Sequence, residues 1–198
     1  MIEFGDDNMH LKHTTNLIFT AILLSLLSVC FTSCKHQPPS RSIDAAYDLH
    51  SIKTLYDIAE TYVSEEIGSD YALWGFSVTR NNADNTETAE FVYTKRTQSF
   101  RDVYFVKIDI ANRQINSTVQ TEAERLYGSD TVVSVSDWVL DDLDLLFDTS
   151  FAWDSATAET TYQNLDIRYY LNNELRYECE FDPCNGQLLG ENGDNAPD

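Results

Sequence analysis

The fold of this chain is best predicted from two similar stretches, YFVKIDIANRQI at residues 104–115 and YECEFDPCNGQL at residues 177–188. They share tyrosine, aspartate, asparagine and glutamine at matching positions, 73 residues apart. In each stretch an alternation typical of a strand ends at the aspartate, whose side chain can cap a turn, and the asparagine adopts a positive φ at little cost. Each stretch therefore predicts two antiparallel strands joined by a tight turn.

Two helices are indicated by apolar residues at helical spacing. The first covers residues 51–67, with Ser51 as N-cap and Gly68 as its stop, and the second starts near Ser136 with Asp137 in its first turn. Their apolar stripes are Ile52, Leu55, Tyr56, Ala59, Tyr62, Val63 and Ile67 in the first helix, and Val139, Leu140, Leu143, Leu146 and Phe147 in the second. The other face of the second helix carries Asp141, Asp142, Asp144 and Asp148, which we expect to be solvated.

The order of helix, tryptophan and hairpin occurs twice along the chain. Trp74 follows the first predicted helix, and Trp153 follows the second. We therefore predict an α+β fold of two tandem helix-plus-antiparallel-sheet repeats, at residues 43–118 and 119–190. The second repeat is shorter because it lacks the loop at residues 81–88 of the first.

Alternating residues predict half-buried strands around these hairpins. The inward-facing residues are expected to be Trp74, Phe76 and Val78 in one strand, Leu165, Ile167 and Tyr169 in another, and Leu175, Tyr177, Cys179 and Phe181 in a third, opposite Arg176, Glu178 and Glu180. Asparagine-rich segments at 81–85 and 172–173 predict turns between strands. The polar residues 191–198 predict a flexible tail.

The two closing hairpins resemble those of a known family. The segments IDIANRQI and FDPCNGQLLG are similar to the closing hairpin of PepSY-type domains, in which a strand ends in valine-aspartate and turns through threonine-glycine before an apolar residue. Arg113 stands where the family has glycine. The plan of two helix-plus-sheet repeats in a small acidic exported protein also resembles β-lactamase inhibitory protein in its architecture.

The most apolar run of the chain, residues 17–31, ends shortly before Cys34. The run is shorter than the roughly 20 residues that span a bilayer, but it has the length of a secretory signal core. The segment FTSC, residues 31–34, resembles the lipobox of Bacteroidetes-type bacterial lipoproteins, whose cysteine is acylated on sulfur and becomes the new N-terminus. This resemblance implies a signal peptide at residues 1–33 and a lipid anchor on Cys34, because two or three acyl chains hold a protein stably at a membrane.

The flanks of this segment refine the prediction. Acidic residues before Met9 have the wrong charge for the start of a signal peptide, so we expect the natural start at Met9. Residues 34–42 would form a short lipidated tether. The tether lacks the acidic cluster that surface lipoproteins of this bacterial group carry, which favours the periplasmic face over the cell surface. The alternatives are a plain signal peptide cleaved elsewhere and a single-span anchor.

The charge of the chain excludes nucleic acid as a partner. The sequence has 13 Lys+Arg against 33 Asp+Glu, a formal charge of −20, so phosphate backbones would repel it. Residues 1–33 contain only one lysine and three acids, so the acidity belongs to the folded part. Solubility after export is the simplest explanation of such acidity.

Few residues are suited to catalysis or metal binding. Of the four histidines, only His50 lies outside the leader and the tether, and we expect it to be a solvated surface residue. The acidic segments at 141–144, 182–186 and 191–194 lack the alternating oxygen ligands and glycine turn of a calcium loop. We therefore predict no catalytic residue, no metal and no cofactor. With so many acids, however, some close carboxylate pair is inevitable.

Cys179 and Cys184 are the thiols of the predicted folded part. Cys179 lies three residues before the turn that holds Cys184, and three extended steps cover about 10 Å, beyond the roughly 7 Å Cα limit of an unstrained disulfide. The spacing favours a buried free Cys179 and a free Cys184 in the turn over a disulfide.

Tyr93, Phe105 and Tyr170 have the wrong parity for the predicted inner face, so they are candidates for a partner-binding surface. We expect a membrane-anchored exported protein whose α+β module acts by binding, as an inhibitor or accessory subunit of an envelope protein. Two alternatives stay open. A carboxylate-dependent envelope enzyme would have a cleft with two acids of opposed pKa. A structural or adhesive lipoprotein would have an exposed sheet edge.

Overall fold

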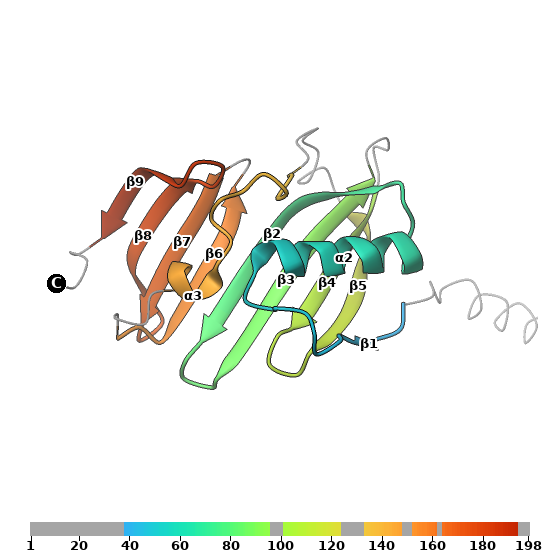
Figure 1. Ribbon diagram of the computed structural model, residues 1–198, viewed down its shortest axis with the longest axis horizontal. Coiled ribbons are helices and arrows are strands. Elements are labelled where there is room, and N and C mark those ends of the chain that lie inside the picture. The colour runs from blue at the N-terminus through green and yellow to red at the C-terminus, as the bar shows by residue number, and fades with distance from the viewer. Residues whose placement is uncertain (1–37, 96–100, 124–132, 148–151, 162–163, 194–198) are drawn as a thin grey trace, which may run out of the picture. The chain divides into compact units, whose positions relative to one another are not determined.

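Nine antiparallel strands form one sheet in the order β1-β5-β4-β3-β2-β6-β7-β8-β9 (Figure 1). The computed structural model describes residues 38–95, 101–123, 133–147, 152–161 and 164–193. The strands are β1 (Arg41–Ser42), β2 (Tyr71–Asn81), β3 (Thr86–Lys95), β4 (Arg101–Asp109), β5 (Gln114–Ala123), β6 (Ser155–Thr161), β7 (Asn164–Leu171), β8 (Glu174–Asp182) and β9 (Gln187–Gly193). The described part is therefore mostly β, and the predicted antiparallel sheet is confirmed.

The sheet is continuous across the boundary predicted between two repeats. Strands β2–β5 and β6–β9 form two meanders, which join because β2 pairs with β6. Helix α2 (Ile52–Glu66) precedes the first meander, and α3 (Leu143–Leu146) precedes the second. The structure thus shows one sheet with one helix of 15 residues and a single further helical turn, and it does not show two tandem repeats.

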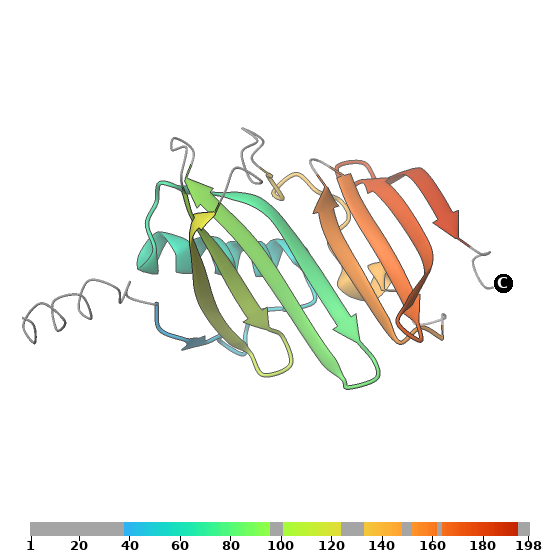
Figure 2. The same ribbon diagram turned by 180° about the vertical axis from the view of Figure 1, so that it is seen from behind.

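Helix α2 forms where the apolar spacing predicts it. The Oγ of Ser51 accepts a hydrogen bond from the backbone N–H of Thr54 at 3.1 Å, and Gly68 follows the helix with a φ of 142°. The buried side chains are Ile52, Leu55, Ala59, Tyr62 and Val63. Helix α2 lies across β2–β5 on the helix-bearing face of the sheet (Figure 1). The opposite, helix-free face comes forward in Figure 2, where the strands lie in front of both helices.

The second predicted helix is wrong in length, because within the described residues 133–147 only α3 is helical, although a helix is expected from Ser136. The backbone N–H groups of Val139 and Leu140 donate to the carbonyl of Pro183, at 2.8 and 3.3 Å, so they do not make the bonds of a continuing helix. Asp142 is the N-cap of α3, and its side chain accepts from two backbone N–H groups of the first turn. Capping therefore delays the start of the helix to Leu143.

The aspartates of residues 141–144 are not the solvated face of a helix. The carboxylate of Asp141 accepts hydrogen bonds from Ser51 Oγ at 3.0 Å and from the backbone N–H of Lys53 at 2.7 Å. It therefore caps the start of α2 from 88 residues away in the chain. Asp142 caps α3, and Asp148 lies outside the described residues.

A β-bulge changes the predicted alternation of β2. Phe76 and Val78 are buried on the helix-bearing face, as predicted. The bulge between Leu73 and Gly75 places Leu73 in the core and leaves Trp74 only partly buried, so the prediction for Trp74 is wrong.

The alternation of β7 and β8 is confirmed except at one residue. The buried or partly buried inward residues are Leu165, Ile167, Tyr169, Tyr177, Cys179 and Phe181. Leu175 is instead 49% exposed. The register shifts between Tyr169 and Tyr170, so Leu175 pairs with Tyr170 and lies with it on the helix-free face; the prediction for Leu175 is therefore wrong.

The two hairpins that match in sequence have similar caps. In each, the Oδ2 of the aspartate accepts a hydrogen bond from the side-chain amide of the asparagine three residues later, at 2.9 Å for Asp109 and Asn112 and 2.7 Å for Asp182 and Asn185. The positive φ falls one residue after the asparagine, at Arg113 (51°) and Gly186 (75°). The other predicted turns are confirmed, with positive φ at Asn85, Asn172 and Asn173.

Arg113 occupies a backbone conformation that favours glycine, and its side chain explains why arginine is present. Its Nη2 donates to the carbonyls of Asp44 and Tyr47, and its own carbonyl accepts from the N–H of Ile43 at 2.8 Å. The side chain thereby fastens the segment before α2 to the β4–β5 turn. These hydrogen bonds offset the free-energy cost of placing arginine in the left-handed backbone region, about 1 kcal/mol.

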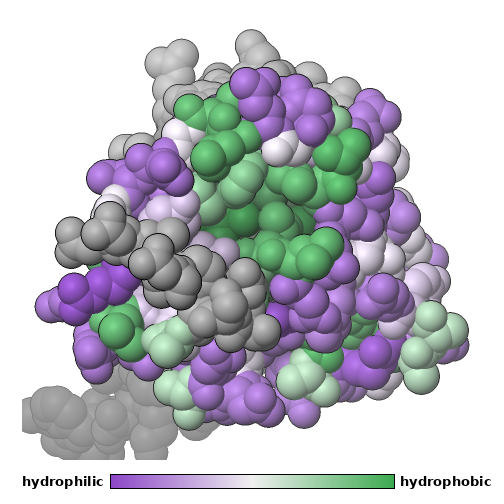
Figure 3. All heavy atoms as spheres, turned by 60° about the vertical axis from the view of Figure 1, so that its left-hand side comes forward, coloured by the Kyte–Doolittle hydropathy of each residue, from purple (hydrophilic) through white to green (hydrophobic). Residues whose placement is uncertain are grey.

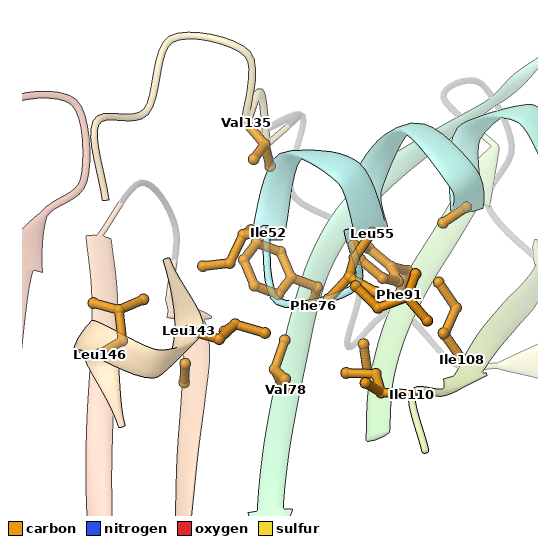
Figure 4. Packing of buried hydrophobic residues seen from close by; sticks show 14 of the residues in the cluster. Ile52, Leu55, Phe76, Val78, Phe91, Ile108, Ile110, Val135, Leu143 and Leu146 are labelled. Carbon is orange, nitrogen blue, oxygen red and sulfur yellow. The ribbon is translucent and has the colours of Figure 1, made fainter. Parts of the chain in front are cut away.

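One hydrophobic core lies between the helices and the sheet (Figure 4). Ile52 and Leu55 of α2 pack towards Val78 of β2 and Phe91 of β3, and all four have 0% exposure. Leu143 of α3 joins the same cluster. The core therefore continues from the first meander to the second, although α3 is short.

Both ends of the folded part differ from the predicted boundaries. Arg41 and Ser42, assigned to the tether, form β1 and pair with Ile115 and Gln114 of β5. Residues 191–193, assigned to the tail, belong to β9. Residues 1–37, including the predicted signal peptide and the lipidation site, lie outside the described residues, as do 194–198. Neither described helix has the length and apolar character needed to cross a membrane.

Candidate functional site

Strand β9 forms one edge of the sheet. In the described part of the chain it pairs only with β8, and six of its seven residues are exposed. It contains no lysine, arginine or proline, the residues that commonly protect an edge strand. Leu189 is an extra residue at a bulge, which leaves Gly190–Gly193 as the longest regularly paired segment. Strand β9 therefore offers a short row of backbone N–H and C=O groups to another chain.

Apolar side chains gather beside β9 on the helix-bearing face. Val139 is 60% exposed and Leu188 is 45% exposed. Leu188 lies opposite Phe181 of β8, and the side chains of Val139 and Leu140 come within 3.6 Å of the Cβ position of Gly186. Figure 3, in which the β9 end comes forward, shows apolar atoms in a hollow ringed by polar residues. We refer to Val139, Leu140, Phe181 and Leu188 as the apolar surface.

The apolar surface is uncovered because α3 is only one turn long. A helix of the predicted length would have turned Val139 and Leu140 onto the sheet. Their backbone N–H groups bind the carbonyl of Pro183 instead. Burial of apolar area contributes about 25 cal/mol per Å², so a cluster of such side chains left in water marks a surface suited to a partner.

The helix-free face of the same strands is acidic. Asp166 of β7 lies opposite Glu180 of β8, which in turn lies opposite Gly190 of β9. A groove of about 340 Å³ is lined by Asp166, Glu178, Glu180, Gly190, Glu191 and Asn192, and we refer to it as the acidic groove. Like charges directly across neighbouring strands are destabilising. The pairing of Asp166 with Glu180 therefore costs stability to the extent that neighbouring side chains do not offset the charge.

Arg168 neutralises part of this charge. Its guanidinium contacts Glu178 at 2.5 Å, Glu159 at 2.6 Å and Asp166 at 3.4 Å. The hydrogen bond to Glu178 is the largest cause of the raised pKa of Arg168. One guanidinium thus contacts three carboxylates, so the net charge of this cluster is still negative.

Glu180 lies outside the reach of Arg168. Its Oε1 accepts a hydrogen bond from the side chain of Asn164. Its Oε2 lies 3.8 Å from the Cβ position of Gly190, the nearest atom to that position. Because Gly190 has no side chain, open space connects the carboxylate of Glu180 with the edge of the sheet.

The charge near β9 also acts on groups buried beside it. Burial, followed by the charges of Glu191 and Glu178, raises the pKa of the Cys179 thiol to about 12. Burial and a 2.9 Å hydrogen bond to Glu191 raise the pKa of Tyr177 to about 12. Cys179 therefore stays protonated at neutral pH and is not a nucleophile. Cys179 and the exposed Cys184 are both free thiols, as predicted.

The structure does not bring the predicted partner-binding residues together. Tyr93 has 0% exposure and shares its face of β3 with the buried Phe91, so its placement on a partner surface is wrong. Burial, followed by the charge of Glu60 on α2, raises the pKa of Tyr93. Phe105 and Tyr170 are partly buried and lie on β4 and β7, with three strands between them. They do not form one surface.

A second charged cluster joins the two helices to the sheet. Arg80 contacts Glu87 and Asp144, both at 2.8 Å, and its guanidinium lies 5.3 Å from the ring centre of Phe147. The Nδ1 of His50 lies 2.8 Å from Asp144, and the hydrogen bonds from His50 and then Arg80 lower the pKa of Asp144. His50 is exposed, as predicted, but it has a partner. These ion pairs connect elements of the fold to one another, so we interpret the cluster as structural.

Chemistry at carboxylates or metals has little basis in the described residues. No group of three or more histidine, cysteine, aspartate or glutamate side chains in these ranges is arranged to hold a metal ion. Among the described carboxyl groups, Asp70, Asp109 and Asp144 have a shifted pKa. All three shifts are downward, and none of these residues lines the acidic groove.

A smaller groove of about 290 Å³ lies between α2 and the segment around β1. Ile43, Ile58 and Tyr62 line it together with Asp44 and Asp57. It has fewer exposed apolar groups than the β9 end, where four large hydrophobic residues of the segment before α3, of β8 and of β9 are at least 45% exposed: Val139, Leu175, Leu188 and Leu189. The β9 end is therefore the stronger candidate site.

Comparison of the chain with known protein families, curated proteins and solved structures gives no match. The alternation of β8 predicted its acidic outer residues correctly. Local sequence does not indicate that β9 is an edge, because strand order depends on how distant segments pair.

Proposed function

We propose that this chain is an exported, lipid-anchored bacterial protein whose folded part binds another envelope protein at the β9 end of the sheet and performs no catalysis. The observation that carries the binding role is the apolar surface beside an edge strand. Exposed apolar clusters and open edges both attract other chains, so a protein usually has them together where a partner covers them.

The proposed location rests on the sequence. Acylation of Cys34 follows from the FTSC segment and the apolar run before it. The periplasmic face follows from the lack of acids directly after the cysteine. A mass measurement of the N-terminal peptide from the native host tests the anchor, and an unmodified Cys34 thiol would refute it.

The proposed fold plan is a duplicated unit of helix and four-strand meander, as in the PepSY-like or β-lactamase-inhibitory-protein-like plan. Two observations support it. The chain order of helix followed by four strands occurs twice, and the hairpins after Asp109 and Asp182 have matching asparagine caps. On this proposal the second helix has shrunk to α3, which leaves the apolar surface free for binding.

Position-specific photo-crosslinking in the producing cells tests the binding role. A photoreactive amino acid replaces Leu188 of the apolar surface in one variant of the full-length chain. It replaces Tyr47 in a matched control, because Tyr47 is 50% exposed and lies near the β1 end. We expect a discrete adduct with one other envelope protein from position 188 and none from position 47. No adduct at position 188, or equal adducts at both positions, would refute the proposal.

The open edge also favours one alternative, a structural or adhesive lipoprotein that assembles with itself. The same crosslinking experiment separates the two functions. An adduct with twice the mass of the chain would support self-assembly and count against a separate partner. The carboxylate-enzyme alternative calls for two acids of opposed pKa in one cleft, and the described carboxyl groups with a shifted pKa do not line the acidic groove.

A further inference from the structure

We propose that β9 binds an extended partner segment in which basic and apolar side chains alternate, and that this segment joins the sheet as a tenth strand. The inference rests on the proposed binding role and names the chemistry of the partner. It depends on three features of the β9 end: the free backbone edge, the acidic groove and the positions of two glycines.

The backbone of Gly190–Gly193 is the pairing segment. These residues pair regularly with β8 and lie beyond the bulge at Leu189. An added strand would continue the cross-strand rows already present in the sheet, because residues directly opposite each other share a face. The side chain opposite Gly190 would therefore lie on the helix-free face, as the side chain of Glu180 does.

A basic side chain fits opposite Gly190. Glu180 and then Asp166 continue the same row inward from Gly190, and both are acidic. A lysine or arginine on the added strand would extend over Gly190, which has no side chain to block it, towards Glu180 Oε2. The ammonium or guanidinium would form a charge-assisted hydrogen bond with Glu180, which is not among the carboxylates that Arg168 contacts.

An apolar side chain fits three residues away, opposite Gly193. Gly193 pairs with Tyr177, whose side chain lies on the helix-bearing face. Tyr177 is partly buried there and packs against the hydrophobic core, so an apolar side chain on the added strand would continue that packing at the edge. Because strand side chains alternate between faces, positions three apart lie on opposite faces. A segment with a basic residue opposite Gly190 and an apolar residue opposite Gly193 has an alternating pattern.

Charge decides between such a segment and a second copy of this chain. Two β9 strands paired with each other would bring two acidic grooves close together, at a cost in repulsion. The excess of acids in the chain would add to that cost. A basic, extended segment of another protein has the complementary charge.

Labelled peptides provide the test, with the full-length chain in detergent and fluorescence polarisation as the readout. The probe is the capped peptide VKVKVKVKV. The first control is VVKKVVKKV, which has the same composition without the alternation, and the second is VEVEVEVEV. We expect saturable binding of the probe and at least about tenfold weaker binding of both controls. Raising the salt from about 50 to 500 mM should weaken binding of the probe, because screening acts on the exposed charges.

N-methylated peptides test whether the probe pairs with the backbone of β9. Methylation of the amide nitrogens of either all valines or all lysines removes the donors along one side of the extended peptide. We expect one of these two peptides to bind and the other to fail, since only one side faces β9. Equal binding of both methylated peptides would refute strand addition.

Variants of the chain identify the groove. Gly190→Ile places a branched side chain over Gly190, where the nearest atom to the added Cβ is Glu180 Oε2 at 3.8 Å, an ordinary van der Waals contact. We expect it to abolish peptide binding. Glu180→Gln should weaken binding about tenfold, whereas Glu90→Gln, the same change on the same face of β3, should leave it unchanged. Circular dichroism confirms that each variant is folded.

The outcomes separate this inference from the proposed function. Equal binding of VKVKVKVKV and VVKKVVKKV, binding that survives in Gly190→Ile, or no binding of any peptide would each overturn the inference. If the crosslink at Leu188 still appears in that case, the partner docks on the apolar surface without joining the sheet. If the crosslink is absent and the probe binds as expected, the proposed partner in the envelope is wrong while the chemistry of the edge stands.

Discussion

Replacing Asp141 with alanine tests the most unexpected contact in the fold. On a solvated helix face, as the sequence suggests, the change would be harmless or slightly stabilising, because alanine is the better helix former by about 0.7 kcal/mol or less. In the structure, the Asp141 carboxylate accepts from Ser51 Oγ and from the backbone N–H of Lys53 at the start of α2. The two readings therefore predict opposite signs for the change in stability.

The expected magnitude follows from the contacts that are lost. Loss of a side-chain cap on a helix N-terminus costs about 1 kcal/mol. Loss of the negative charge at that end of the helix costs about 0.5 kcal/mol, and the unpaired hydroxyl of Ser51 costs about 1 kcal/mol more. We expect Asp141→Ala to lower the free energy of unfolding by about 2–3 kcal/mol, which corresponds to about 5–10 °C in Tm for a chain of this size.

Urea unfolding followed by circular dichroism measures this change. Asp141→Asn keeps an acceptor for Lys53 but loses the charge, so it should fall between wild type and Asp141→Ala. Asp137→Ala is the matched control, because Asp137 is exposed and close in sequence, and it should change stability by less than about 0.5 kcal/mol. If Asp141→Ala is as stable as Asp137→Ala, the long-range cap of α2 does not exist.

Three further predictions concern charge, thiols and backbone. The pKa of Asp144 is lowered, so its ionised form stabilises the fold above the ordinary carboxyl pKa of about 3.9. The stability advantage of wild type over Asp144→Asn should therefore vanish as the pH falls from about 5 to below the lowered pKa. Urea titrations at a series of pH values measure this difference. Iodoacetamide should alkylate Cys184 in the folded chain, and Cys179 only after unfolding. Peptide mapping identifies the modified thiol. Modification of Cys179 under native conditions would contradict its burial and its raised pKa. Gly186→Ala should lower the free energy of unfolding by about 1 kcal/mol, because Gly186 has a φ of 75°. Gly190→Ala should leave stability nearly unchanged. Equal shifts in Tm for the two variants would argue against the turn geometry at Gly186.

The features that the sequence predicted correctly are those with local signals. Helix α2 has a complete apolar stripe with a cap at Ser51 and a glycine after its end, and these suffice to locate it. The hairpins have aspartate caps and asparagines within a few residues. The alternation of β7 reports directly which side chains are buried, because its period is the period of the strand.

The features that were missed depend on contacts between distant segments. The stripe from Val139 to Phe147 has helical spacing, but Pro183 takes two of the N–H groups that a helix would use. The bulge beside Trp74 shifts the alternation by one residue, and a single sequence carries no clear sign of it.

The candidate site was only partly predictable for the same reason. The outward parity of Glu178 and Glu180 was correct, but neither the edge position of β9 nor the space over Gly190 follows from local sequence. Tyr93 is predicted on the wrong face of β3, because the alternation of residues along a strand does not show which face α2 covers. Packing of the helix decides that question.

The first and last strands of the sheet lie at its two opposite margins, β1 at one and β9 at the other (Figure 1). If Cys34 is the membrane attachment, the seven residues from there to β1 allow at most about 24 Å of slack. Eight interstrand spacings of about 4.8 Å then separate the attached margin from the free one. On that condition, a body that meets β9 binds the margin of the sheet opposite the strand that continues towards the attachment, so binding and attachment would not compete for the same edge.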